Sequence, residues 1–176
     1  MNIAQSTIAP ADLSSVSLQR SSVLVVENFW SPDERQFFRE KMNGASWKSL
    51  SDLPHVRADF PNSGNWAKAE IGPEEGQRFL LRLQLPCIQD HIESFPNIIG
   101  RHVGFNYYSY SAGDCLLTHD DTDQGRLVEG RRAPKRRIAV VTYVHEEWQP
   151  DWGGELIIYE RRADRAGGPI NLIPTH

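Results

Sequence analysis

The sequence contains few cysteines. Its 176 residues include two, Cys87 and Cys115, which stand far apart in the chain. Two isolated cysteines are too few for a disulfide framework or for a cysteine-rich zinc site. We therefore predict two reduced, partly buried thiols.

Long hydrophobic runs and an excess of positive charge are also lacking. No stretch approaches the ~20 consecutive apolar residues of a membrane-spanning helix, and the first six residues have neither the basic region nor the apolar run of a secretory signal. The chain has 19 Lys and Arg against 23 Asp and Glu, a net charge of −4, which is the wrong sign for a general phosphate-backbone binder. We expect a cytoplasmic protein with neither membrane nor nucleic acid as a partner.

Hydrophobic residues make up 39% of the chain, and a chain of this length can bury an ordinary core without cross-links. No internal repeat and no linker divides it. Residues 1–22 are polar and rich in serine, which predicts a flexible leader. We expect one domain over residues 23–176.

A helix start follows the first apolar strand, which we expect over residues 23–26. Ser31 can cap the helix, Pro32 suits its first position, and Glu34 completes a capping box. The helix should run to about Met42. Gly44 then lies where a left-handed cap is favourable.

The remaining elements divide at Pro96. Before it, residues 45–73 predict loops with one short strand, and residues 74–95 predict a second helix that Pro86 must kink or split. After it, the pattern is typical of strands, which we expect at residues 103–110, 115–119, 137–144, 154–159 and 170–173. Helices followed by antiparallel strands indicate an α+β, mainly β fold: a β-sandwich or jelly roll with helices on one side.

Chemistry is concentrated in Thr118-His119-Asp120-Asp121. Side chains alternate on an extended segment, so His119 and Asp121 face the same way. An imidazole and a carboxylate two residues apart suit the 2-His-1-carboxylate triad of non-haem Fe(II). The pair alone is also compatible with a surface histidine near solvated acids.

The surrounding motifs favour the metal interpretation. In order, they are Tyr110, Gly113-Asp114, His119-Asp120-Asp121, Arg137, Tyr143, Trp148 and Gly153-Gly154-Glu155-Leu156. This order resembles the Fe(II)/2-oxoglutarate-dependent dioxygenases of the prolyl-hydroxylase-like branch. The segment 23–29 with its capped helix is similar to that family's N-terminal element, so the resemblance covers most of residues 23–176.

The resemblance implies a double-stranded β-helix (jelly roll) that holds iron at its open end. His119 and Asp121 would be metal ligands, and Tyr143 and Tyr110 would bind the cosubstrate 2-oxoglutarate; each tyrosine could instead be a core aromatic. Fe(II), 2-oxoglutarate and ascorbate are the cofactors implied. The reaction implied is hydroxylation of a protein side chain or small metabolite, with decarboxylation of 2-oxoglutarate to succinate. We interpret the glycine pair 153–154 as a backbone turn, and Trp148 and Trp152 as packing residues.

The distal His of the triad and the Arg or Lys that pairs with 2-oxoglutarate normally follow an Ile-Pro turn, which here is Ile173-Pro174. His176 could be the distal ligand, or the domain could be incomplete at the C-terminus. A different function therefore stays open, a non-catalytic jelly-roll binding module without a complete iron triad.

The segment between the His-x-Asp pair and the next strand is basic. Six of its twelve residues from 126 to 137 are Lys or Arg, against a single Glu. This segment could clamp an acidic small-molecule or peptide substrate, or it could be a solvated loop.

Overall fold

The computed structural model describes residues 16–20, 23–59, 61–96, 98, 103–117, 127–128, 131–132, 138–158 and 170–172. The helices there are α1 (Pro32–Asn43), α2 (Pro54–Asp59), α3 (Pro73–Arg82) and α4 (Pro86–Glu93), with 3-10 turns η1 (Leu50–Asp52) and η2 (Pro150–Trp152). The strands are β1 (Val16–Arg20), β2 (Val23–Val26), β3 (Lys48–Ser49), β4 (Ala67–Glu70), β5 (Asn106–Ser109), β6 (Leu127–Val128), β7 (Arg131–Arg132), β8 (Leu156–Ile158) and β9 (Ile170–Leu172).

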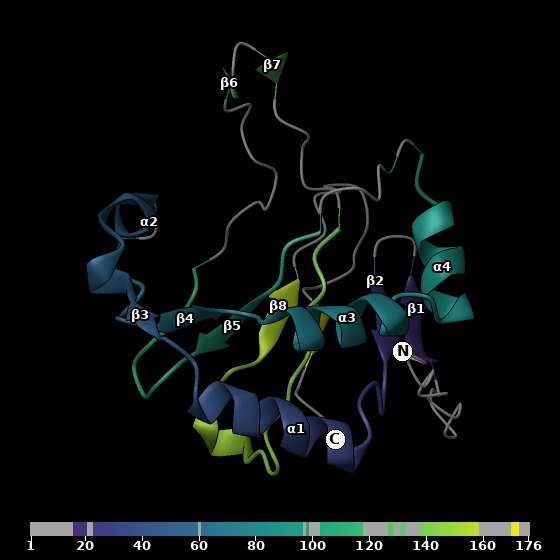
Figure 1. The fold of residues 1–176 in the computed structure, drawn as a ribbon, viewed down its shortest axis with the longest axis horizontal. Helices are drawn as coiled ribbons and strands as arrows, with labels where there is room; N and C mark the ends of the chain where they lie inside the picture. Colours follow the sequence, from purple (N-terminus) through teal and green to yellow (C-terminus); the bar gives the residue numbers. More distant parts are fainter. Residues whose placement is uncertain are drawn as a thin grey trace, which may run out of the picture.

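These elements make a mixed helix and sheet structure (Figure 1). The largest sheet among them has three antiparallel strands in the order β3-β4-β5, and the other strands form the antiparallel pairs β1-β2, β6-β7 and β8-β9. The mixture of helix and antiparallel sheet agrees with the α+β part of the prediction, but the described residues are not mainly β. The described pairings do not establish a double-stranded β-helix.

The helix start predicted at Ser31 is confirmed. The Ser31 hydroxyl accepts from the backbone N–H of Glu34 (3.2 Å), and the Glu34 carboxylate accepts from the backbone N–H of Ser31 (2.9 Å). The prediction of a left-handed cap at Gly44 is wrong, because its φ is −96°. The Gly44 N–H instead donates to the Lys41 carbonyl (3.1 Å) and the Ala45 N–H to the Met42 carbonyl (3.2 Å), which a right-handed backbone can satisfy.

The second predicted helix is split where proline required it. α3 ends at Arg82, and α4 begins at Pro86, which lacks the N–H that a continuous helix would need. Residues 16–20, which fall within the predicted leader, form β1 and pair with β2 in antiparallel register.

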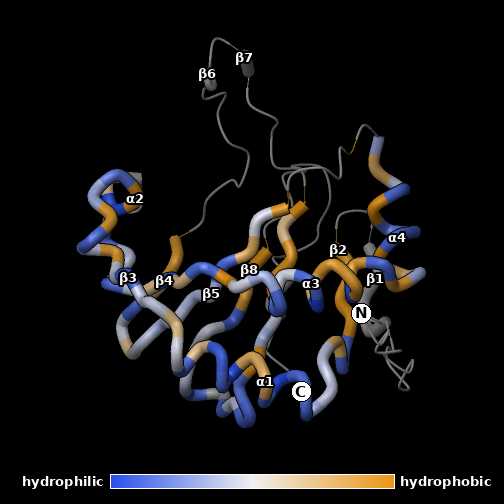
Figure 2. Tube along the Cα trace, viewed as in Figure 1, coloured by the Kyte–Doolittle hydropathy of each residue, from blue (hydrophilic) through white to orange (hydrophobic). Residues whose placement is uncertain are grey.

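The core lies between the helices and one face of the β3-β4-β5 sheet. Its buried cluster is Trp30, Phe38 from α1, Ala69 from β4, Phe79 from α3 and Tyr107 from β5. In Figure 1, α1 lies below the sheet. Figure 2 shows hydrophobic and hydrophilic residues alternating along α1 and α4, whereas β2 is hydrophobic throughout. α1 and α3 therefore contribute apolar side chains to one face of the sheet, and the opposite face is free of this cluster.

The later predicted strands are only partly found. The strand expected at 103–110 contains β5, the one at 154–159 contains β8, and the one at 170–173 contains β9. Residues 115–117 and 138–144 carry no strand assignment, and the rest of those two predicted strands lies outside the described residues. None of the helices that the structure describes is long and apolar enough to cross a membrane.

Candidate functional site

The predicted metal ligands His119 and Asp121 lie outside the described residues, as does His176. Within the part of the chain that the structure describes, no three His, Cys, Asp or Glu side chains gather closely enough to hold a metal ion. The site can therefore be built from the two predicted tyrosines and from the segments around them.

Tyr143 lies in the extended segment after residue 138 and is half-buried. Its phenolic O–H donates to the carbonyl oxygen of Gly154 across 3.2 Å. Burial raises the pKa of the Tyr143 phenol, and the nearby Glu155 carboxylate raises that pKa further. Tyr143 is therefore a neutral hydrogen-bond donor at physiological pH.

Tyr110 follows β5 and is 45% exposed. Burial of its hydroxyl end raises its pKa to about 12, and the neighbouring Tyr108, Tyr143 and Asp114 side chains contribute further. The structure thus brings Tyr110 and Tyr143, 33 residues apart in sequence, close enough for one phenol to act on the other. Both phenols keep their protons at neutral pH.

Asp114 fixes the turn that leads from Tyr110 toward the predicted metal ligands. Its carboxylate accepts from the backbone N–H of Asn65 (2.7 Å) and of Ser111 (2.8 Å), and these bonds hold the pKa of the Asp114 carboxyl below its ordinary value. The N–H of Cys115 donates to the Ser63 carbonyl across 3.2 Å. These bonds join the loop at residues 61–66 to the turn at residues 111–115, which follows Tyr110.

The 61–66 loop needs a glycine for this contact. Gly64 has a φ of +75°, and a Cβ there would lie 2.3 Å from the Asp114 carboxylate and 2.8 Å from its Cα. The Gly-Asp pair in the sequence indicated the turn, but the partner loop of Asp114 could not be read from the local pattern.

The glycine pair 153–154 turns the backbone, which confirms its predicted role. Both φ values are positive, 71° and 90°. The Trp148 indole N–H donates to the Gly153 carbonyl (2.7 Å), so Trp148 anchors the same turn that accepts from Tyr143. The prediction that Trp152 is a packing residue is wrong, because it is 61% exposed. The Cys115 residue is also exposed rather than partly buried.

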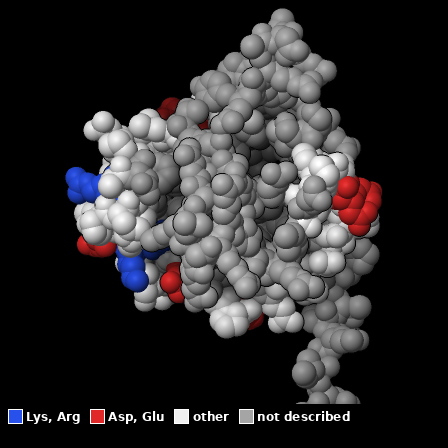
Figure 3. Space-filling model, turned by 90° about the horizontal axis from the view of Figure 1, so that it is seen from above, with Lys and Arg blue, Asp and Glu red and all other residues white. Residues whose placement is uncertain are grey.

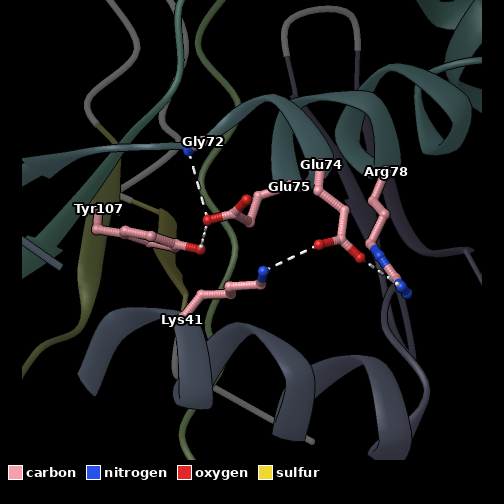
Figure 4. Close-up of polar contacts among 6 residues, drawn as sticks. All are labelled: Lys41, Gly72, Glu74, Glu75, Arg78 and Tyr107. Atoms are coloured by element: carbon pink, nitrogen blue, oxygen red, sulfur yellow. Dashed lines mark hydrogen bonds and ion pairs between the residues drawn. The ribbon is translucent and has the colours of Figure 1, made fainter. Parts of the chain in front are cut away.

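Two helix-start carboxylates are buried, which the sequence analysis did not predict: it named Glu34 only as part of a capping box and did not single out Glu75. Glu34 pairs with Arg82, joining α1 to α3. Figure 4 shows the second one, Glu75, which accepts from the Tyr107 phenol and from the N–H of Gly72, both across 3.4 Å. Burial and the Glu75 carboxylate raise the pKa of Tyr107 above its ordinary range. Tyr107 therefore ties β5 to α3 behind the site.

The predicted basic loop contains a short hairpin. β6 and β7 pair in the register Leu127 with Arg132 and Val128 with Arg131. The other residues from 126 to 137 lie outside the described residues.

Residues 105–173 match the family model of the 2OG-Fe(II) oxygenase superfamily. The matched segment contains Tyr110, Asp114, Tyr143 and the 153–154 turn. It supports an oxygenase-type enzyme at the level of the superfamily. Searches of curated proteins and of solved structures gave no match to the chain.

Proposed function

We propose that the chain is an Fe(II)- and 2-oxoglutarate-dependent oxygenase of the prolyl-hydroxylase-like branch. It would hydroxylate a peptide side chain or a small metabolite and convert 2-oxoglutarate to succinate and carbon dioxide. The observation that carries this proposal is the match of residues 105–173 to the oxygenase superfamily, a segment that contains both predicted cosubstrate tyrosines, Tyr110 and Tyr143.

The two phenols fit a carboxylate ligand. Each keeps its proton at neutral pH, so each offers an O–H donor to an anionic oxygen. A hydrogen bond to an ionised acceptor is stronger than one between neutral groups. A distal carboxylate of 2-oxoglutarate would therefore compete well with the Gly154 carbonyl for the Tyr143 proton, and the anchored 153–154 turn would keep the Tyr143 ring in place.

His119 and Asp121 would hold the metal, since a neutral imidazole and a carboxylate are suitable donors for Fe(II). Bound iron would supply the redox chemistry of oxygen activation. The Asp114 carboxylate would position this pair, because it fixes the turn five residues before His119. We propose a double-stranded β-helix as the frame for this arrangement and a soluble, cytoplasmic setting for the reaction.

Anaerobic titration tests the proposal. Adding Fe(II) and 2-oxoglutarate to the protein should give the visible charge-transfer absorption of a chelated complex, and adding oxygen should release succinate. His119→Ala should abolish both signals, whereas the matched control His55→Ala, on α2, should leave them unchanged. Tyr143→Phe should keep the absorption but weaken the binding of 2-oxoglutarate.

Absence of the absorption and of succinate release from the wild-type protein would overturn the proposal. That outcome would favour a non-catalytic jelly-roll binding module instead. Equal absorption in wild type and His119→Ala would show that the metal binds elsewhere.

A further inference from the structure

The face of the β3-β4-β5 sheet that points away from the core carries lysine and aromatic side chains. Cross-strand pairing aligns Lys48 with Lys68 and Lys68 with Tyr108, so these three residues form one row across the sheet. The neighbouring row of β4 and β5, Ala69 and Tyr107, is buried in the core. Because side chains alternate along a strand, the lysine row lies on the opposite face.

The same face continues toward the candidate site. Ala67 pairs with Ser109, so the next residues along the two strands, Trp66 and Tyr110, stand opposite each other. The ring centroid of Trp66 lies 6.0 Å from that of Tyr110 and 5.8 Å from that of Tyr108. We call the surface made by Lys48, Trp66, Lys68, Tyr108 and Tyr110 the aromatic–lysine face.

The two lysines have no carboxylate partner in the part of the chain that is described. Within those residues no ion pair joins Lys48 or Lys68 to an acid, whereas Lys41 on α1 bonds to Glu74 across 2.9 Å (Figure 4). Like charges directly opposite each other on antiparallel strands repel. An anion placed between the two ammonium groups would remove this repulsion.

The aromatic part of the face offers a platform beside that charge. Tyr108 is 48% exposed and Tyr110 is 45% exposed, and both rest on Trp66, which is buried. Among the residues that the structure describes, the indole N–H of Trp66 has no hydrogen-bond partner. Exposed phenol rings over a buried indole suit a flat ring better than a branched aliphatic group, because aromatic rings stack or meet edge to face.

We propose that the aromatic–lysine face docks the substrate of the oxygenase, and that this substrate is an anionic molecule carrying a planar ring. The inference rests on the proposed function, because Tyr110 belongs both to this face and to the proposed cosubstrate site. The anionic group lies between Lys48 and Lys68, the ring lies on Tyr108, and Lys68 determines the preference for an anion. The rest of the substrate then extends along the sheet toward Tyr110.

The described charges seen from above are of both signs. Lys and Arg atoms lie on the side of β3 and α2 with Asp and Glu atoms beside them, and a further acidic group lies on the side of α4 (Figure 3). The attraction of an anion therefore depends on the two lysines themselves and not on a wider positive surface.

Binding of matched probes tests the proposal without iron. Phenylacetate and phenylacetamide share a ring and differ in charge, and their binding to the metal-free protein can be measured by calorimetry or ligand-observed NMR. A hydrogen bond to a charged group contributes enough for phenylacetate to bind about tenfold more tightly than the amide. Lys68→Gln should reduce this ratio toward one, Lys68→Arg should preserve it, and Lys48→Gln should lower it.

Two further variants separate the ring from the charge. Tyr108→Leu should weaken the binding of phenylacetate and of phenylacetamide by the same factor, because it removes the aromatic ring on which they stack and leaves both lysines. Lys41→Gln removes the same charge from α1 and should leave the ratio unchanged. Equal binding of acid and amide by the wild type, or an unchanged ratio in Lys68→Gln, would overturn the proposal.

A competition experiment shows whether the lysines bind the substrate or the cosubstrate. If 2-oxoglutarate displaces phenylacetate, and Lys68→Gln lowers the affinity for both ligands by the same factor, the lysines bind the cosubstrate and the proposal of a substrate site is wrong. Simultaneous binding of both ligands supports it. Because the probes bind without iron, failure of the charge-transfer test leaves this result intact, so the two proposals can fail separately.

Discussion

Removal of the Arg82 guanidinium should strongly destabilise the fold, because it leaves a buried carboxylate without its cation. The Arg82 side chain is 5% exposed and the Glu34 side chain 10% exposed, and the two form an ion pair between α3 and α1. The guanidinium also lies 5.6 Å from the centroid of the Trp30 ring. Breaking a buried ion pair at one partner costs about 3–5 kcal/mol.

We therefore expect Arg82→Met to lower the free energy of unfolding by that amount. In a domain of this size each kcal/mol shifts Tm by about 2–4 °C, which corresponds to a fall of about 6–20 °C. Glu34→Gln combined with Arg82→Met removes both charges and keeps an amide oxygen to accept from the Ser31 N–H. The double variant should recover at least half of the loss, measured by urea unfolding at pH 7.

The pH dependence gives an independent check. Burial raises the pKa of Glu34, but hydrogen bonds from the Ser31 N–H and from Arg82 outweigh it, so the folded pKa lies below the ordinary value of 4.5. A lowered folded pKa adds stability above the unfolded value and loses it as the pH falls through the folded one. Below about pH 4.5 the wild type should lose stability. In Arg82→Met, protonation neutralises the unpaired Glu34 carboxylate, so the difference in free energy of unfolding between the two proteins should become smaller. Two results would refute this reasoning. One is a difference in free energy of unfolding that grows as the pH falls, and the other is a double variant whose loss of stability equals the sum of the losses in Glu34→Gln and Arg82→Met.

Three further perturbations test the packing and the site. Gly64→Ala should destabilise the protein by more than about 1 kcal/mol, because φ is +75° and the added Cβ would overlap Asp114; thermal unfolding that matches the wild type would contradict this contact. The ultraviolet titration difference between the wild type and Tyr110→Phe should give a pKa of about 12 for Tyr110, raised mainly by burial, and Tyr143→Phe should lower this pKa slightly; an ordinary value near 10 would mean that the Tyr110 phenol is not buried. Phe38→Ala, at a fully buried ring, should cost about 3–5 kcal/mol by urea unfolding, and a loss below about 1 kcal/mol would place this ring outside the core.

The helices could be predicted because their signals are local. Ser31 and Glu34 lie within one turn of each other, and Pro86 alone is sufficient to end α3 and restart the chain as α4. Gly44 was misjudged because glycine permits a left-handed cap without requiring one. The turn at 153–154 could also be predicted from a local signal, because two adjacent glycines favour a turn.

The sheet could not be predicted in the same way. β4 consists of Ala, Lys, Ala and Glu, residues that are rare in strands, and the sequence indicated mainly loops there. Pairing with β3 on one side and β5 on the other holds it as the central strand, and these partners come from distant parts of the chain. The meeting of Tyr110 with Tyr143 depends on tertiary structure too, although the motif order had indicated both residues.

The chemistry of the aromatic–lysine face depends on the packing of the core behind it. Ala69 and Tyr107 are 3% and 6% exposed and stand opposite each other. A slip of one residue in β4 would place Lys68 against the aromatic core and turn Ala69 outward, so burial of an unpaired charge opposes it strongly. On β5, the bond from the Tyr107 phenol to Glu75 selects the face from which Tyr108 projects. Buried neighbours that do not contact the anion therefore hold the anion-binding residues in register. Substitutions at Ala69 should alter anion binding at Lys68, although Ala69 does not itself contact the anion.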